Sequence, residues 1–475
     1  MTDHPVPEDV LRSIAMPDHV TTPLGELRFF DGLPDEATIA SSYELLDLIR
    51  GIDVYLDTIP GASLAALRAG LRSVGVDSAR TLAYTDPRAN SGSYYLTPNT
   101  ETTYGTTFLD LRADGPTVVE NPPESLCVVD DFWFRYVADL GLAGPDKGAG
   151  GTYLFLPPDH EGEVPDGYVT YRCPTYTNWL VVRALGGVPD LKKTRVYPLA
   201  QADAPPPMRY LNIADTHHNT VHSNDSTYYE EIDTLVQEEP AEALDPERAG
   251  RLAALGIVKG KPFAPDDRLR GILEKAAPIA AGIARALVYK PRDPDAYVYP
   301  GESSWKVPFI GGSHEFLRNG ARLLDARALF HYFATVITPA MAAQTVGTGS
   351  QYAYTAEDST GAWLDGSRTY RLRLPSDVPA KNFWAVDLYD TQTRSLLQTD
   401  NPYPALSSLP GTLRTNDDGA TDLFFGPTAP DGRESNWIQT VPGKAWFAML
   451  RLYGPLEPWF DKTWRPGEIE PLSQV

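Results

Sequence analysis

The stretch Trp446-Phe447-Ala448-Met449-Leu450-Arg451-Leu452 indicates the fold class, because its side chains alternate between two kinds of position. The even-numbered positions form one apolar row, and the odd-numbered positions carry Phe, Met and Arg. A repeat of two residues is typical of a β-strand, and strands of this kind belong to antiparallel sheets with one or both faces covered. Tyr370, Leu372 and Leu374 alternate with arginines in the same way. The sequence therefore predicts a β domain from about Gly349 to Pro466.

A second β region precedes it in the chain. Between Pro116 and Ala184, short runs rich in Val, Tyr, Phe and Trp recur about every ten residues, with turn clusters such as Asn121-Pro122-Pro123 between them. Strands at this spacing are typical of a sandwich or a barrel. A parallel sheet with alternating helices in either half would contradict the prediction.

Helical patterns lie before and between these β regions. Ile39, Tyr43, Leu46 and Ile49 recur at three- and four-residue steps, which predicts an amphipathic helix from Asp35 to about Leu56. We expect Asp35 to cap this helix, Pro60 to end it, and a second helix to cover Ser63 to Leu71.

A longer helical block is predicted from about Asp225 to Ile337. In it, Asp245 caps a short helix that has Pro246 at its first position and Gly256 at its end. Asp266 caps a longer helix, and another covers Leu323 to Val336. We therefore expect an N-terminal arm at 1–34, a helical lead-in at 35–78, a β-sandwich domain at 79–215, a helical connecting segment at 216–348 and a second β-sandwich domain at 349–475.

The charge balance argues against several partner classes. The 475 residues include 63 Asp and Glu against 41 Lys and Arg, for a net charge of −22. Nucleic acids and anionic membranes would be repelled by such a chain. The sequence has no run of 18 apolar residues, so we expect no membrane insertion. The beginning of the chain is acidic without an apolar stretch, which favours a cytoplasmic location.

Few residues point to a bound cofactor. Cys127 and Cys173 lie in apolar, strand-like stretches, and we expect both to stay reduced. The glycine-rich stretch from Gly144 to Gly151 does not match a phosphate loop, because its lysine precedes the glycines and a strand follows. We therefore expect no nucleotide cofactor.

The segment from Asp215 to Asp225 contains His217, His218 and His222. His218 and His222 are four residues apart, so on a helix they would share one face and suit a divalent metal. The alternative is a polar loop that precedes the next helix, with the histidines in water. The sequence favours this alternative and leaves a divalent metal as the second hypothesis.

Leu96 to Gly105 is an unusual stretch in which seven of ten residues carry a polar side chain, and it contains Asn99, Glu101, Thr103 and Tyr104. Such a loop at the rim of a β domain orients a small ligand, or it satisfies its own polar groups as a turn. Asn436 and Trp437 form a comparable stretch in the C-terminal half.

A second group of candidate residues follows a strand in the N-terminal half. Asp131, Trp133 and Arg135 alternate with aromatic residues, so both faces of this strand should be covered and Arg135 at least partly buried. A buried guanidinium needs a carboxylate partner, for which Glu101 and Asp131 are the candidates. We therefore expect Glu101, Tyr104 and Arg135 to face one cavity of the N-terminal β domain, or else to form a structural ion pair.

Several motifs together resemble a bacterial family in which domain of unknown function 1254 is followed by domain of unknown function 1214. In the first half they include Thr97-Pro98-Asn99-Thr100-Glu101, Asp131-Phe132-Trp133 and Pro174-Thr175-Tyr176-Thr177-Asn178-Trp179, and in the second half Tyr389-Asp390, Ser435-Asn436-Trp437 and Arg451-Leu452-Tyr453-Gly454-Pro455. The resemblance covers roughly Thr22 to Pro466. It implies a mainly β protein with helical insertions and two jelly-roll-like antiparallel β-sandwich domains. It supplies no catalytic residues.

Two functions are compatible with these patterns. The first is an enzyme that acts on a small, largely apolar organic molecule by acid/base hydrolysis, elimination or isomerisation, with or without a metal. Its catalytic candidates are Glu101, Tyr104, Asp131 and Arg135, and its substrate-binding candidates are Asn99, Thr103, Trp133, Asn436 and Trp437. The second is a non-catalytic protein that binds a small molecule or a carbohydrate through its aromatic residues. A homo-oligomer is compatible with either function.

Overall fold

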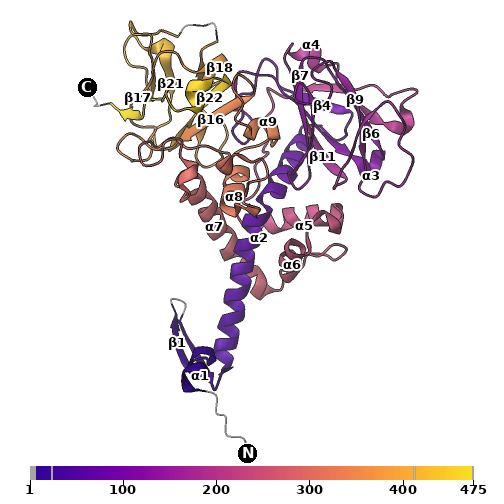
Figure 1. Cartoon of the computed structure of the whole chain (residues 1–475), viewed down its shortest axis with the longest axis vertical. Coiled ribbons are helices and arrows are strands. Elements are labelled where there is room, and N and C mark those ends of the chain that lie inside the picture. The colour runs from indigo at the N-terminus through magenta and orange to yellow at the C-terminus, as the bar shows by residue number, and fades with distance from the viewer. Residues whose placement is uncertain (1–6, 23–24, 410, 412, 473–475) are drawn as a thin grey trace, which may run out of the picture.

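The computed structural model describes residues 7–22, 25–409, 411 and 413–472. Two β domains lie side by side, a group of helices lies below and between them, and a narrow arm projects from this body (Figure 1). The arm consists of helix α1 (Glu8–Ile14), the sheet β1-β2-β3 (His19–Thr22, Gly25–Phe30 and Leu33–Pro34) and the first turns of helix α2 (Glu36–Ser73). In the described residues, no helix is long and apolar enough to cross a membrane.

Helix α2 runs through the whole molecule and is longer than the sequence predicts. The Asp35 carboxylate caps it by accepting from the Thr38 N–H at 2.7 Å, as expected. Pro60 was expected to end the helix and instead lies inside it, so the prediction of two separate helices is wrong. A proline removes one helical hydrogen bond, but this part of α2 is buried against α5, α7 and α8, and that packing outweighs the loss.

The contact between α2 and its neighbours is close. A Cβ atom added at Gly51 would lie 2.8 Å from the Cβ of Ala276 on α7, so only glycine permits this crossing. The part of α2 that precedes Gly51 is mostly exposed instead. Ile39, Tyr43, Leu46 and Ile49, which form the predicted apolar stripe, are all exposed on the projecting part of the helix.

The N-terminal β domain contains two sheets that share one core. The six-stranded sheet has the order β13 (Arg209–Asn212), β4 (Thr81–Tyr84), β5 (Gly105–Asp110), β11 (Thr177–Ala184), β7 (Ser125–Asp131), β8 (Tyr136–Gly141). The four-stranded sheet has the order β10 (Val169–Arg172), β9 (Gly151–Leu156), β6 (Thr117–Asn121), β12 (Arg195–Pro198). Buried residues from both sheets form one hydrophobic cluster, which makes the domain a sandwich. The short helices α3 (Leu111–Asp114) and α4 (Val188–Leu191) lie at its edges.

The C-terminal β domain repeats this plan with two four-stranded sheets. One has the order β16 (Ser350–Thr355), β22 (Trp446–Pro455), β18 (Ala380–Asp390), β19 (Ala405–Ser407). The other has the order β21 (Trp437–Gln439), β20 (Thr421–Gly426), β17 (Tyr370–Leu374), β23 (Ile469–Pro471), and helix α10 (Glu457–Phe460) follows β22. The fold is thus mainly β with helical insertions, as predicted. Its sheets are antiparallel except for three parallel pairs at sheet edges, β9–β10, β4–β13 and β20–β21.

The segment between the sandwiches is helical. It contains α5 (Tyr228–Glu238), α6 (Pro246–Ala254), α7 (Asp267–Tyr289), α8 (Leu324–Phe333), α9 (Pro339–Ala342) and a short hairpin of β14 (Leu317–Arg318) and β15 (Ala321–Arg322). Asp245 and Asp266 cap α6 and α7, which confirms both predicted helix starts. The largest hydrophobic cluster joins these helices to α2 and to both sandwiches.

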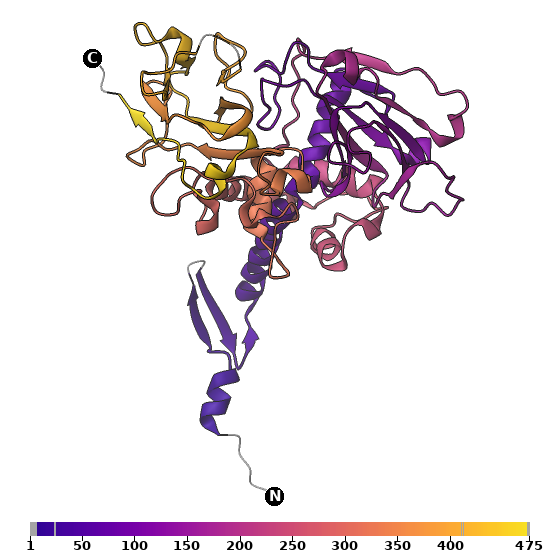
Figure 2. The same ribbon diagram turned by 45° about the horizontal axis from the view of Figure 1, so that its top comes forward.

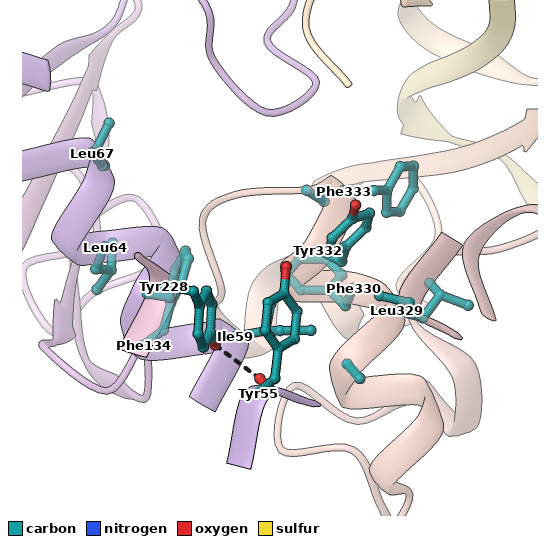
Figure 3. Close-up of a cluster of buried hydrophobic side chains, with 14 of the residues drawn as sticks. Tyr55, Ile59, Leu64, Leu67, Phe134, Tyr228, Leu329, Phe330, Tyr332 and Phe333 are labelled. Carbon is teal, nitrogen blue, oxygen red and sulfur yellow. Dashed lines mark hydrogen bonds between the residues drawn. The ribbon is translucent and has the colours of Figure 1, made fainter. Parts of the chain in front are cut away.

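Figure 3 shows the centre of this cluster, where Tyr55 and Ile59 of α2 meet Tyr228 of α5 and Tyr332 of α8. Tyr55 and Tyr228 stack with their ring centroids 3.9 Å apart. Because the helices contact both domains, they hold the two sandwiches in a defined relation to each other.

Candidate active site

The outer face of the sheet β16-β22-β18 is polar at one end. In antiparallel strands, directly opposite residues lie on the same face, and Tyr352 pairs with Arg451 while Met449 pairs with Asp387. The even-numbered residues of β22 belong to the core of the C-terminal sandwich. Its odd-numbered residues, among them Arg451 and Tyr453, face away from that core together with Asp387.

The polar loop predicted from the sequence lies against this face. Its shape comes from Asn99, whose Oδ1 accepts hydrogen bonds from the N–H groups of Glu101 at 3.2 Å and Thr102 at 3.0 Å. Asn99 Nδ2 donates to the Tyr104 hydroxyl at 2.9 Å. Asn99 therefore shapes the loop and brings Tyr104 back toward it, which supports the self-satisfied turn for this residue.

Several hydrogen bonds hold the loop to the C-terminal sandwich. Arg451 Nη2 donates to the Thr97 carbonyl at 2.7 Å, and the Tyr389 hydroxyl donates to the Pro98 carbonyl at 2.7 Å. On the other side of the loop, the Thr97 N–H donates to the Arg394 carbonyl at 2.8 Å. The junction between the domains is thus made of directed polar contacts as well as apolar packing.

Two carboxyl groups from different domains meet at this junction. Glu101 comes from the loop, and Asp387, which is 0% exposed, comes from β18. Arg451 Nε lies 3.0 Å from Asp387 Oδ2, and the Thr100 hydroxyl donates to Glu101 Oε1 at 2.8 Å. The second oxygen of each carboxyl, Glu101 Oε2 and Asp387 Oδ1, is buried and has no hydrogen-bond partner among the described residues.

Burial controls the protonation of this carboxyl pair. It raises the pKa of Glu101, although Thr100 and Arg451 oppose the shift. Burial and the charge of Glu101 raise the pKa of Asp387 well above its usual value, against the effect of Arg451. Both shifts favour the protonated form, so this pair holds a proton more tightly than a solvent-exposed carboxyl group does.

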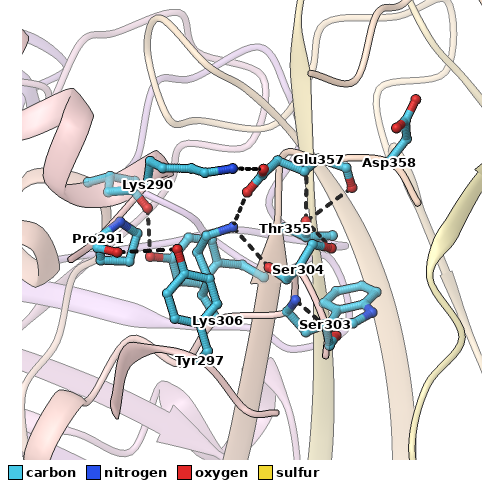
Figure 4. Close-up of polar contacts among 12 residues, drawn as sticks. Lys290, Pro291, Tyr297, Ser303, Ser304, Lys306, Thr355, Glu357 and Asp358 are labelled. Atoms are coloured by element: carbon cyan, nitrogen blue, oxygen red, sulfur yellow. Dashed lines mark hydrogen bonds and ion pairs between the residues drawn. The ribbon is translucent and has the colours of Figure 1, made fainter. Parts of the chain in front are cut away.

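Buried carboxyl groups elsewhere in the chain differ in how fully they are bonded, and Asp130 Oδ1 and Asp358 Oδ2 are also buried without a hydrogen-bond partner among the described residues. Glu357, 3% exposed, receives one hydrogen bond on each oxygen, from Lys290 and from Lys306, whose Nζ lies 2.9 Å away (Figure 4). Burial alone would raise the pKa of Glu357, but the two lysines outweigh burial and lower it. Glu357 is therefore a satisfied structural carboxylate, whereas Glu101 and Asp387 each retain a free oxygen.

Aromatic residues surround the carboxyl pair. The Tyr453 hydroxyl is buried and also has no partner among the described residues. The Tyr453 ring stacks on Phe383 with centroids 4.1 Å apart, and the guanidinium of Arg183, from β11 of the other domain, lies 5.5 Å from its centroid. The site therefore combines acidic, basic and phenolic groups in an environment of low polarity.

The second group of predicted catalytic residues lies elsewhere. Arg135 is exposed, and its guanidinium pairs with Asp131 at 2.6 Å and donates to the Ala243 carbonyl at 2.8 Å. Asp131 is the partner that the sequence allowed. Arg135 was predicted to be at least partly buried, and 42% of its side chain is exposed. The prediction that it shares a cavity with Glu101 is wrong. Asp131 Oδ1 also accepts from the N–H groups of Trp133 and Arg135, so its carboxylate shapes the tight turn between β7 and β8.

The remaining predicted binding residues are scattered. Trp133 is 3% exposed and packs in the central cluster against Gly61 of α2. Asn436 Nδ2 donates to the carbonyls of Arg414 and Asp422 at 2.8 Å, and Trp437 Nε1 donates to Gly426, so both hold the C-terminal sandwich together. Thr103 is half-buried in the polar loop. Of Trp133, Asn436, Trp437 and Thr103, only Thr103 is close in sequence to a member of the carboxyl pair, Glu101.

The three histidines have separate surroundings. Helix α5 begins at Tyr228, so 217–222 is not helical and the shared face that a metal site required is absent. His217 Nδ1 lies 2.7 Å from the Gly92 carbonyl, and His218 Nε2 lies 2.7 Å from the Tyr95 hydroxyl. His218 and His222 are buried, so the alternative with all three in water is also wrong. Within the described ranges, no three His, Cys, Asp or Glu side chains are arranged to hold a metal ion.

Sequence reasoning missed Asp387 and Arg451 as site residues. The sequence contains a pattern that could have identified them, because each is a charged residue within an otherwise apolar strand. A charge at such a position is rare unless it is paired, and it points to a partner on the same face. The alternation of β22 placed Arg451 on the face away from the core, but the loop that covers this face lies in the other half of the chain.

Comparison with known proteins agrees with this architecture. Residues 80–203 match the family described as "Protein of unknown function (DUF1254)", and residues 349–457 match "Protein of unknown function (DUF1214)". No curated protein matches the chain. The crystal structure of the VPA0106 protein from Vibrio parahaemolyticus is similar in fold, with a TM-score of 0.53 and 18% identity over 90% of this chain and 99% of that chain. An uncharacterised protein from Burkholderia cenocepacia has a TM-score of 0.39 and 13% identity over 91% of this chain and 96% of that chain.

Proposed function

We propose that this protein, which belongs to the family in which a DUF1254 region is followed by a DUF1214 region, is an enzyme that transfers protons on a small, largely apolar organic molecule. Glu101 and Asp387 act as its acid and base. This function keeps the acid/base chemistry expected from the sequence and the role of Glu101. It moves the site from the interior of one sandwich to the junction between the two.

The observation that carries the proposal is a pair of carboxyl groups, Asp387 buried and Glu101 half-buried, that each hold one buried oxygen without a hydrogen-bond partner among the described residues. A structural ion pair with Arg451 needs only one carboxylate. A second buried carboxyl adds a desolvation cost, and each unsatisfied oxygen costs about 1–3 kcal/mol. Groups that are held at such a cost, with raised pKa values, are typical of catalytic sites.

The pair supplies both halves of a proton transfer. The ionised carboxylate takes a proton from the substrate, and the protonated carboxyl gives its proton to another substrate atom, so the number of protons is conserved. Arg451 stabilises negative charge that develops between these steps. Hydrolysis, elimination and isomerisation all contain such a step, and the tyrosine rings around the pair suit a substrate with apolar parts.

The test is a search for catalysed exchange and turnover in ²H₂O. Small ketones, esters, epoxides and unsaturated acids are incubated with the protein, and deuterium incorporation and product formation are followed by NMR. We expect turnover of at least one compound class, and a loss of at least about 100-fold in kcat for Glu101→Gln and for Asp387→Asn. Glu357→Gln, which changes a buried carboxylate outside the site, is the matched control and should keep its kcat.

Two results would contradict the proposal. Turnover that both junction variants retain would place the chemistry elsewhere. Saturable binding of a compound without exchange or product, abolished by the same variants, would favour the second function, a non-catalytic small-molecule binder.

A further inference from the structure

The projecting arm exposes an unusual amount of apolar surface. More than half of the exposed large apolar side chains among the described residues lie before residue 50. On the arm sheet, Phe30 is 80% and Leu33 is 68% exposed. On α2, Tyr43 is 62% and Ile49 is 53% exposed, and Ile39 and Leu46 lie on the same side of the helix. Figure 2 shows that this part of the chain stands apart from the body.

The arm has no core of its own. Helix α1 buries none of its residues, the strands β1, β2 and β3 bury none of theirs, and Thr38 is the one residue of α2 that is buried before Gly51. Small sheets and short helices without a buried apolar face are marginal in water. The ordered form of the arm therefore needs a partner surface.

The spacing on α2 fits a second helix of the same kind. Ile39, Tyr43 and Leu46 are four and three residues apart, which is the narrow seam of a two-helix coiled coil. The six exposed apolar side chains of the arm sheet and α2, at about 80 Å² each, supply roughly 480 Å² per partner, and the four on and beside α1 bring the arm to roughly the 800 Å² that a standard interface buries.

The charges on the arm select the partner and its orientation. Residues 7–50 contain nine carboxylates and three arginines, which disfavours an anionic membrane surface. Glu36 stands at the beginning of the exposed helical segment and Arg50 at its end, and neither has an ion-pair partner within the described part of the chain. If two copies of this segment pack antiparallel, Glu36 of each copy lies beside Arg50 of the other.

We propose that the arm is a dimerisation element and that its partner is the arm of a second copy of this chain. The two α2 segments pack antiparallel about a two-fold axis near Tyr43, so Ile39 of one copy contacts Leu46 of the other. Phe30 and Leu33 of each arm sheet extend the interface. This inference does not depend on the proposed catalytic function.

The first test measures mass in solution by light scattering and sedimentation over a range of concentrations. We expect a dimer for the full chain and a monomer for Ile49→Asp. Ile279→Asp is the matched control, because Ile279 is similarly exposed at 44% but lies on α7 outside the arm. A full chain that is monomeric at every concentration overturns the proposal. Binding of the monomeric arm to added vesicles or to a lysate protein would then identify a different partner. A dimer that persists in Ile49→Asp also overturns the proposal, and so does a dimer that dissociates in Ile279→Asp.

The second test distinguishes the antiparallel arrangement by charge reversal and cross-linking. Glu36→Arg and Arg50→Glu should each weaken the dimer by about 10-fold or more in Kd, and the double variant should restore it, because it exchanges the two charges. Tyr43→Cys should form a disulfide between copies on oxidation, since the two introduced thiols would lie close to the axis. Failure of both the rescue and the cross-link in a chain that still dimerises would overturn the proposed arrangement. Circular dichroism confirms that each variant is folded.

Discussion

The guanidinium of Arg451 lies 2.7 Å from the Thr97 carbonyl, so a buried cation on a strand of the C-terminal sandwich holds a loop of the N-terminal sandwich. The same side chain pairs with Asp387 in its own sheet. Arg451 therefore links the relative position of the two domains to the charge of the carboxyl pair. A change in either one should be detectable in the other.

The first prediction concerns this link. Arg451→Met should lower the free energy of unfolding by about 3–5 kcal/mol, because it leaves buried carboxyl groups without their cation. Adding Asp387→Asn should recover part of the loss, since the amide carries no charge to compensate. Urea unfolding of the two single variants and the double variant measures this coupling. A loss below about 1 kcal/mol for Arg451→Met would show that the pair contributes little.

The second prediction concerns pH. Because the folded pKa of Glu101 is raised, the folded protein holds a proton that the unfolded chain releases above about pH 4.3. The contribution of Glu101 is therefore fully present below that pH and is lost as the pH rises through its folded pKa. Glu101→Gln should flatten the dependence of stability on pH from 5 to 8, measured by urea unfolding at each pH. An unchanged slope would mean that Glu101 titrates normally.

The third prediction has the opposite sign. Burial lowers the pKa of His331 to about 3, with Arg327 and Arg248 adding to the effect, although hydrogen bonds to carbonyls oppose it. The contribution of His331 is present above about pH 6.5 and is lost as the pH falls toward 3, at about 1.4 kcal/mol per pH unit. His331→Phe, which keeps an aromatic ring among its aromatic neighbours, should reduce this acid sensitivity. An acid sensitivity that is unchanged in His331→Phe would contradict the prediction.

The fourth prediction concerns the cysteines. Cys127 is 3% and Cys173 1% exposed, both are free thiols, and burial raises the pKa of Cys127 to about 12. Neither should react with thiol reagents in the folded protein, and both should react after unfolding. Single replacements by Ala or Val should cost less than about 3 kcal/mol. Labelling followed by mass spectrometry tests the reactivity, and rapid labelling of native protein would contradict the prediction.

Local sequence determined much of the fold. The two-residue alternation around Arg451 and the caps at Asp245 and Asp266 depend on neighbouring residues alone, and the structure has the β-strand and both helices there. The helix end predicted at Pro60 is wrong because the rule behind it considers only neighbouring residues in the chain. Packing of α2 against four other helices supplies more stabilisation than one lost hydrogen bond removes.

The composition of the candidate site was partly determined by the sequence, since Glu101 and Tyr104 stand out in an unusually polar loop. The tertiary structure alone decided that Asp387 and Arg451, from the other sandwich, complete the site and that Arg135 does not belong to it. The residues next to a side chain in the sequence determine the local structure that it favours. The partner of a buried charge is instead set by which surfaces the helices bring together, and these surfaces come from segments hundreds of residues apart.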